Sequence, residues 1–250
     1  MTGILYLCAT PIGNLGDMTP RVVETLRSVD LIAAEDTRNS LKLMTHFEIH
    51  TPMTSYHEYN KVEKAYTLIA KLQEGQNIAL ITDAGTPAIS DPGEVLVRMC
   101  LEAGIRVTSL PGAAACITAL TMSGLSTRRF CFEGFLPPDK KERTEILEDC
   151  REESRTMIFY EAPHHLKKTL QELAAVLGDR KITLCREYVL VIEGKSYEEK
   201  KQEAQKNWLE MPVEEHVALY ESQGFDRKEA MKKAAKDRGV SKRDIYQSLL

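Results

Sequence analysis

Residues 81–93 read ITDAGTPAISDPG, and this stretch determines the fold class more than any other part of the chain. The short apolar run at 77–80 before it predicts a buried strand, and residues 94–103 after it predict a helix. A strand that ends in a loop of Gly, Pro and small residues before a helix is where open α/β sheets bind ligands. The alternative is an ordinary turn in which Asp83 and Asp91 cap helices.

The first half of the chain alternates strand-like and helix-like patterns. Apolar runs of strand length occupy residues 4–9, 31–34, 77–80 and 105–110. Helical patterns occupy residues 21–29, 62–72, 94–103 and 113–122. This order predicts an α/β fold with a parallel sheet that carries helices on both faces.

A second unit follows a crossing point at 127–141. Its patterns predict strands at 130–135, 157–160, 182–185 and 188–192, and helices at 143–150 and 165–177. The charged stretch 198–220, broken at Met211 and Pro212, and two helices around Gly239 with Ser241 as a cap predict a helical tail. We therefore expect an N-terminal α/β domain at 1–119, a second α/β domain at 120–196 and a helical C-terminal region at 197–250.

The bulk composition is ordinary for a soluble globular protein, with 43% hydrophobic and 28% charged residues. Because the net charge of the 250 residues is -4, any attraction to nucleic acid must come from a local patch. The six cysteines form no C-x-x-C pair and have no His at ligand spacing, which predicts reduced thiols and no metal. No basic leader and no apolar run of about 20 residues occurs, so we expect a cytoplasmic protein without a membrane span.

Four loops follow the predicted strands of the first unit, at 10–17, 35–38, 82–93 and 111–115. In a parallel sheet all four leave the same edge, where they can surround one ligand. The first loop matches neither G-x-G-x-x-G nor a P-loop, so the fingerprint of a dinucleotide or ATP site is absent. Gly13 and Gly16 of this loop are explained equally well by turn geometry and by contact with a ligand. The small residues at 112–115 allow either tight packing of a helix against the sheet or close approach of a flat ligand.

Polar residues gather after two predicted strands. Glu35, Asp36 and Arg38 suit general-base chemistry and phosphate contact, the alternative being a helix N-terminus with acidic residues on its dipole. In the second unit Glu161 follows a strand and is expected to face the cleft between the units. The adjacent pair at 164–165, both His, points to different sides of a helix and makes a poor metal site.

Basic residues cluster near the boundary between the units and again in the tail. The first cluster consists of Arg128, Arg129, Lys140, Lys141 and Arg143. Residues 224–250 hold eight Lys or Arg against four Asp or Glu, an asymmetry typical of nucleic-acid binders. A solvated helical face is the alternative for the tail.

Seven segments together resemble one family. They are ATPIGNLGD at 9–17, AEDTR at 34–38, SYHEYN at 55–60, LITDAGTPAISDPG at 80–93, LPGAAA at 110–115, GFLP at 134–137 and FYEAPHHL at 159–166. On these segments the chain resembles the bacterial 16S rRNA (cytidine-2′-O)-methyltransferase I family of the tetrapyrrole-methylase superfamily, over residues 3–187. The resemblance implies a two-domain fold with S-adenosylmethionine in the interdomain cleft, a homodimer, and methylation of a cytidine ribose in the rRNA of the small ribosomal subunit.

The resemblance also implies roles for individual residues. Asp36 and Glu161 are the candidate bases for the ribose hydroxyl. The candidates for contact with RNA phosphates are Arg38, Arg128, Arg129, Lys140 and Lys141. The expected cofactor contacts are Pro11, Gly13, Asp83, Ala84, Gly85, Ala88, Ile89, Pro111, Gly112, Ala113 and Tyr160.

The chain departs from this family after Glu187. The family carries a charged stretch of about two strands and a helix at this point, whereas here residues 185–187 run directly into YVLVIEG at 188–194. Two other functions therefore stay open: a sister methylase that acts on a tetrapyrrole or a protein side chain, and an RNA-binding relative without catalytic activity. The basic cluster at 128–143 counts against the first, and the intact loops at 82–93 and 111–115 count against the second.

Overall fold

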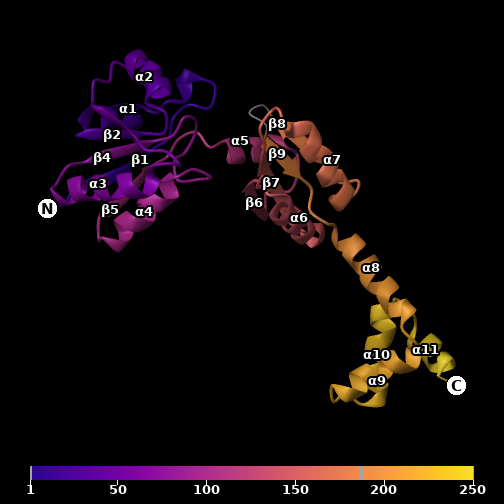
Figure 1. The fold of residues 1–250 in the computed structure, drawn as a ribbon. Helices are drawn as coiled ribbons and strands as arrows, with labels where there is room; N and C mark the ends of the chain where they lie inside the picture. The colour runs from indigo at the N-terminus through magenta and orange to yellow at the C-terminus, as the bar shows by residue number, and fades with distance from the viewer. Residues whose placement is uncertain (1, 186–188, 250) are drawn as a thin grey trace.

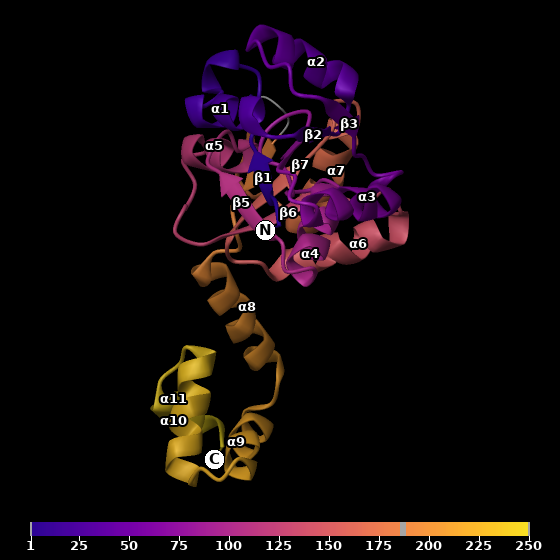
Figure 2. The same ribbon diagram turned by 90° about the vertical axis from the view of Figure 1, so that its left-hand side faces the viewer.

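The computed structural model of the chain describes residues 2–185 and 189–249. Two α/β units, each with its own sheet, are followed by a helical tail (Figure 1). Both views show the tail extending away from the two units, with its first helix nearest to them (Figures 1 and 2). The two units therefore form the body of the molecule, and the tail is joined to this body through its first helix.

The first sheet is entirely parallel, in the order β3-β2-β4-β1-β5. Its strands are β1 (Ile4–Cys8), β2 (Leu31–Ala34), β3 (Met53–Ser55), β4 (Ile78–Ile81) and β5 (Arg106–Leu110). β4 is buried at every position, as expected for a parallel strand covered on both faces. The predicted parallel sheet is confirmed, and β3 is a fifth strand whose three residues are too few for a periodic pattern.

Helices cover both faces of this sheet, as predicted. α1 (Pro20–Ser28) and α2 (Thr37–His46) pack with one face through Val22, Leu26 and Met44. α3 (Lys61–Gln73) and α4 (Gly93–Glu102) pack with the other through Leu68, Leu72 and Leu96. In β1, Leu5 and Leu7 pack in the core beneath α3 and α4, whereas Cys8 packs in the core beneath α1 and α2. This is expected because successive side chains of a strand point to opposite faces of the sheet.

The second sheet is mixed, in the order β6-β7-β9-β8. β6 (Phe130–Phe135) and β7 (Thr156–Tyr160) run parallel, whereas β8 (Ile182–Cys185) and β9 (Val189–Ile192) pair antiparallel. One core joins this sheet to α6 (Lys140–Asp149) and α7 (Leu166–Leu177), and another joins its other face to α5 (Ala115–Met122). The expected boundary between residues 119 and 120 falls inside α5, and the packing of α5 favours a division ahead of this helix.

The point of departure at Glu187 and Tyr188 lies outside the described residues. The strands on either side of it, β8 and β9, pair along their full length: Ile182 lies opposite Ile192 at one end, and Cys185 lies opposite Val189 at the other. The strands that remain therefore make a continuous four-stranded sheet without the segment that the family carries here.

The tail contains α8 (Tyr197–Glu210), α9 (Val213–Ser222), α10 (Arg227–Arg238) and α11 (Lys242–Ser248). Its small core is formed by Val217, Ala230, Ala234, Ala235 and Ile245. The side chain of Ser241 and that of Asp244 form a capping box at the start of α11, which confirms Ser241 as the predicted cap. Short 3-10 helices occupy Leu15–Asp17 and Cys150–Glu152. No helix in the described ranges is long and apolar enough to cross a membrane.

Candidate active site

The carboxyl ends of β1 and β4, which are neighbours in the sheet, are tied together by backbone hydrogen bonds. The N–H of Thr10 donates to the carbonyl of Gly85 at 2.9 Å, and the N–H of Gly85 donates to the carbonyl of Thr10 at 3.1 Å. The buried hydroxyl of Thr10 also donates to the carbonyl of Thr82, at 3.1 Å. The first loop and the 82–93 loop therefore form one rigid platform at the edge where all the parallel strands end.

The 82–93 loop is held in a strained conformation by Asp91. Its carboxylate accepts the backbone N–H of Ala88 at 2.8 Å and that of Gly93 at 2.6 Å. Ala88 and Ser90 have φ values of 67° and 58°, a left-handed conformation that costs roughly 1–2 kcal/mol per non-glycine residue. The hydroxyl of the buried Tyr56 donates to the carbonyl of Pro92 at 3.0 Å and fixes the end of the loop.

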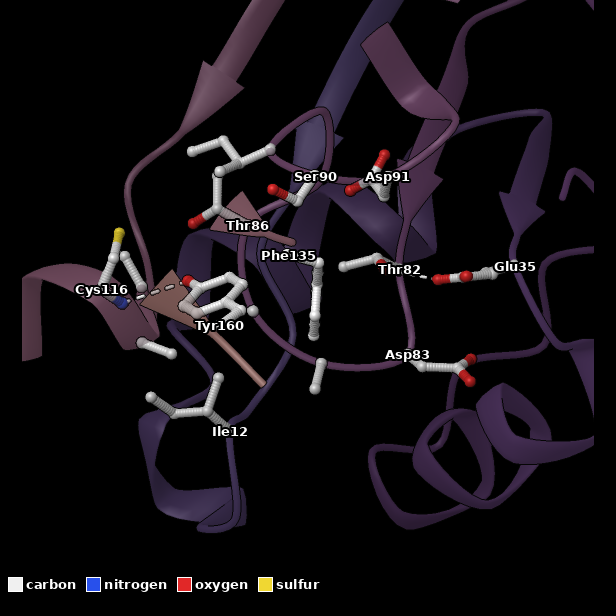
Figure 3. Close-up of a pocket in the computed structure, with 15 residues that line it drawn as sticks. Ile12, Glu35, Thr82, Asp83, Thr86, Ser90, Asp91, Cys116, Phe135 and Tyr160 are labelled. Carbon is white, nitrogen blue, oxygen red and sulfur yellow. Dashed lines mark hydrogen bonds between the residues drawn. The ribbon is translucent and has the colours of Figure 1, made fainter. Parts of the chain in front are cut away.

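A cavity of about 320 Å³ lies between this platform and the second unit (Figure 3). Ile12, Glu35 and the 82–93 loop form one side, whereas Phe135 and Tyr160 come from the strand ends of the second sheet. The hydroxyl of Tyr160 accepts the backbone N–H of Cys116 at 3.1 Å, which joins β7 to the start of α5. The full lining is Ile12, Glu35, Thr82, Asp83, Ala84, Gly85, Thr86, Ile89, Ser90, Asp91, Ala114, Ala115, Cys116, Phe135 and Tyr160.

Five of the expected cofactor residues line this cavity: Asp83, Ala84, Gly85, Ile89 and Tyr160. The other six lie outside the lining, and several of them have a different role. A Cβ on Gly112 would lie 2.6 Å from the Cβ of Ala9, so this glycine serves the close approach of its loop to β1. Ala113 accepts the hydroxyl of Thr86 at 2.8 Å through its carbonyl, while Ala88 and Pro111 lie outside the lining. Pro11 and Gly13 line a neighbouring groove instead.

The other lining residues were not named one by one as cofactor contacts from the sequence, although Thr86, Ala114 and Ala115 lie in the loops at 82–93 and 111–115 that were expected to surround the ligand. Most of them, such as Thr82, Ser90 and Ala114, are neighbours of assigned residues in the same loops. Phe135 was visible only as part of the GFLP segment. It lies next to Gly134, whose positive φ of 65° accompanies an irregularity in the pairing of β6 with β7.

The cavity is acidic. Glu35, Asp83 and Asp91 line it, and no Lys, Arg or His does so within the described part of the chain. Glu35 accepts the hydroxyl of Thr82 at 2.7 Å, and Asp83 accepts the backbone N–H of Asp36 and the side-chain amide of Asn39, both at 3.3 Å. Burial raises the pKa of Asp91, and it also raises that of the Tyr160 phenol, which stays neutral. A site with these groups favours a positively charged ligand.

Asp36 acts as the N-cap of α2, the alternative that the sequence left open. Its carboxylate accepts the backbone N–H of Arg38 at 2.8 Å and pairs with the guanidinium at 2.9 Å. The hydrogen bond from the Arg38 side chain is the largest of the effects that lower the pKa of Asp36 to about 2. Asp36 is therefore ionised at neutral pH and lies beside the cavity, outside its lining.

Glu161 is buried and turned toward α7, so the expectation that it faces the cleft is wrong. Its carboxylate accepts the backbone N–H of Ala162 at 2.7 Å and the hydroxyl of Thr169. The guanidinium of Arg143 lies 3.7 Å from it and binds Glu172 at 2.6 Å. This network anchors the segment after Tyr160. It also neutralises Arg143 with carboxylates, although the sequence had placed this residue in a basic cluster.

The remaining basic candidates lie at two ends of the second sheet. Lys140 and Lys141 are exposed at the start of α6. They follow shortly after Phe135, the last residue of β6, which lines the cavity. Arg128 and Arg129 are exposed just before the opposite end of that six-residue strand, roughly 20 Å away at the usual rise per residue. No group of three or more His, Cys, Asp or Glu in 2–185 and 189–249 is arranged to hold a metal ion.

The model of the tetrapyrrole (corrin/porphyrin) methylases matches residues 4–210. Proteins named ribosomal RNA small subunit methyltransferase I are similar over most of the chain. The protein of Bacillus subtilis (strain 168) is 46% identical over 272 residues, covering 98% of this chain and 93% of that protein. The protein of Haemophilus influenzae is 58% identical over 188 residues, covering 75% of this chain and 66% of that protein.

Solved structures share the fold. Diphthine synthase aligns with a TM-score of 0.59 at 12% identity, covering 78% of this chain and 91% of that protein. The methyltransferase CobJ aligns with a TM-score of 0.58 at 15% identity, covering 78% and 95%. The alignment of 272 positions with the Bacillus subtilis protein exceeds the 250 residues of this chain, so that relative carries at least 22 residues that are absent here.

Replacing Asp91 by Ala is expected to destabilise the protein, because two backbone N–H groups lose their acceptor in a strained loop. The loss should be about 2 kcal/mol in free energy of unfolding, measured by urea denaturation followed by circular dichroism. Asp83→Asn, in the same loop but exposed, keeps a side-chain oxygen for the N–H of Asp36, so it is the matched control and should leave the urea midpoint nearly unchanged. Equal midpoints for both variants would contradict the structural role of Asp91.

Proposed function

The chain belongs to the tetrapyrrole methylase family, and we propose that it transfers a methyl group from S-adenosylmethionine to the ribosomal RNA of the small subunit. The names of its relatives support the reaction and the substrate class. In finer detail, the acceptor is the 2′-oxygen of a cytidine ribose, and the enzyme acts in the cytoplasm as a homodimer. The motifs at 9–17, 34–38, 80–93 and 159–166, through the family they resemble, support the ribose acceptor and the homodimer.

The acidic cavity is the observation that carries the proposal. S-adenosylmethionine bears a sulfonium and an ammonium group, and the carboxylates of Asp83 and Glu35 are partners for such cations. Asp91, whose carboxylate is bound to the loop backbone, adds negative charge to the same lining. The apolar side chains of Ile12, Ile89 and Phe135 offer a surface for its flat adenine ring. The residues present therefore fit this cofactor, and the cavity volume of about 320 Å³ lies at the lower end of the range of small-molecule sites.

When bound, S-adenosylmethionine supplies a methyl group on a positively charged sulfur. The contribution of the chain is to hold that group and the attacking hydroxyl in line and to keep water out. The rigid platform of Thr10 and Gly85 and the fixed 82–93 loop do this positioning. Asp36, beside Asp83, is the better placed of the two candidate bases, and its low pKa suits accepting a hydrogen bond from the hydroxyl more than removing its proton.

The basic residues on the surface supply the contacts to RNA. Arg38 lies shortly after the lining residue Glu35, and Lys140 and Lys141 shortly after the lining residue Phe135, so we assign these three cations to phosphates next to the acceptor. Arg128 and Arg129 lie at the far end of β6 and would contact RNA farther along. An RNA-binding relative without activity is the second candidate, favoured by the missing residues after Glu187.

The charge of the cavity predicts how the protein distinguishes the cofactor from its product. S-adenosylhomocysteine lacks the sulfonium charge, so it should bind more weakly than S-adenosylmethionine in isothermal titration calorimetry. Asp83→Asn should weaken S-adenosylmethionine by roughly 10-fold and reduce the preference, since a charged contact contributes about 1.5–3 kcal/mol. Glu102→Gln, on an exposed carboxylate at the end of α4, is the control and should change neither affinity.

The direct test of the function uses small ribosomal subunits that lack native modification. Incubation with S-adenosylmethionine labelled on the methyl group should place label on one cytidine ribose, mapped by nuclease digestion and mass spectrometry. Cofactor binding without transfer would favour the inactive RNA-binding relative. Label on a base would contradict the ribose assignment.

A further inference from the structure

A second hollow of about 340 Å³ adjoins the acidic cavity on the side of α2. It is lined by Pro11, Gly13, Asn14, Leu15, Asn39, Lys42, Leu43 and Asp83. Asp83 lines both hollows, and hydrogen bonds from Asn39 and from the backbone of Asp36 fix its carboxylate. Ligands in the two hollows would therefore meet at Asp83.

The groove differs in charge from the cavity, because its lining carries one lysine, Lys42, beside the shared carboxylate of Asp83. Lys42 is exposed and forms no ion pair with any residue that the structure describes. Arg38 and Lys42 lie one four-residue step apart, so they share one face of α2. The side chain of Arg38 pairs with Asp36 and is still 89% exposed. Two exposed cations at this spacing suit neighbouring phosphates of a chain.

The amide side chains of the groove keep hydrogen-bonding groups free. Asn14 accepts the N–H of Gly16 at 3.0 Å through its carbonyl oxygen, so its NH₂ group remains a donor. Asn39 donates to Asp83 through its NH₂ group, so its carbonyl oxygen remains an acceptor. Leu15, which is 46% exposed, adds an apolar surface between these groups. A sugar or base edge needs one donor, one acceptor and an apolar contact of this kind.

We propose that this groove binds the acceptor nucleotide of the RNA, with its ribose beside Asp83 and its phosphates along Arg38 and Lys42. This inference rests on the proposed function and adds the place where the substrate lies. It assigns Pro11 and Gly13 to the RNA side of the site, and it introduces Asn14, Asn39 and Lys42 as RNA contacts. The cationic cofactor would thus occupy the hollow with three carboxylates, and the anionic substrate would occupy the adjoining hollow that Lys42 lines.

The test compares Lys42→Ala with Lys42→Arg and with Arg106→Ala. Arg106 is an exposed cation at the amino end of β5, the opposite edge of the same sheet. Lys42→Ala should weaken binding of a single-stranded cytidine-containing RNA oligonucleotide roughly tenfold. It should also reduce the magnitude of the negative slope of log affinity against log salt concentration by about 0.7–1. It should raise the KM for small ribosomal subunits and leave the affinity for S-adenosylmethionine unchanged. Lys42→Arg should restore RNA binding, and Arg106→Ala should match the wild type.

Other results would overturn the proposal in distinct ways. An unchanged salt slope and KM in Lys42→Ala would remove the groove from the RNA site, and a loss of cofactor affinity would assign Lys42 to the cofactor. Displacement of the oligonucleotide by polyaspartate at equal charge concentration would identify a general acidic-ligand site. If the wild type transfers no methyl group while RNA binding still depends on Lys42, the proposed function fails and the groove stands as an RNA site.

Discussion

The two hydrogen bonds accepted by the Asp91 carboxylate are the constraint on which the site depends. They hold Ala88 and Gly93 in place and keep the loop in a left-handed conformation that it would otherwise leave. A Cβ on Gly134 of the second unit would lie 3.0 Å from the hydroxyl of Ser90, so this loop is also where the second unit approaches the first. With Asp91 occupied by the backbone, Asp83 is the carboxylate of the loop that stays exposed to ligands.

Charge separation on a local scale explains how an acidic protein can act on RNA. The net charge is -4, and the cavity itself carries three carboxylates, which suits a cationic cofactor. The cations stand outside the cavity, on α2 and at the start of α6. Asp83 lies at the border between the two regions, where cofactor and substrate must meet for transfer.

The apolar runs and the glycine-rich loops predicted the parallel sheet and the edge at which the site lies, because both are local properties of the chain. Properties that depend on packing were not predictable in the same way. α5 (ACITALTM) is apolar on nearly every side, so its pattern does not reveal that it packs on the second sheet. Glu161 follows a strand as a catalytic residue would, yet Arg143 of α6 and Thr169 of α7, both on other elements, turn it away from the cavity.

If the acidic cavity holds S-adenosylmethionine, the groove beside α2 stays free for RNA. A crystal structure of the protein with the cofactor bound distinguishes this arrangement from its alternative. We expect density for the cofactor among Glu35, Asp83 and Tyr160, with its charged groups near the carboxylates and no cofactor contact to Lys42. Cofactor density in the groove, against Asn14 and Lys42, would show that the cavity and the groove have been assigned the wrong way round.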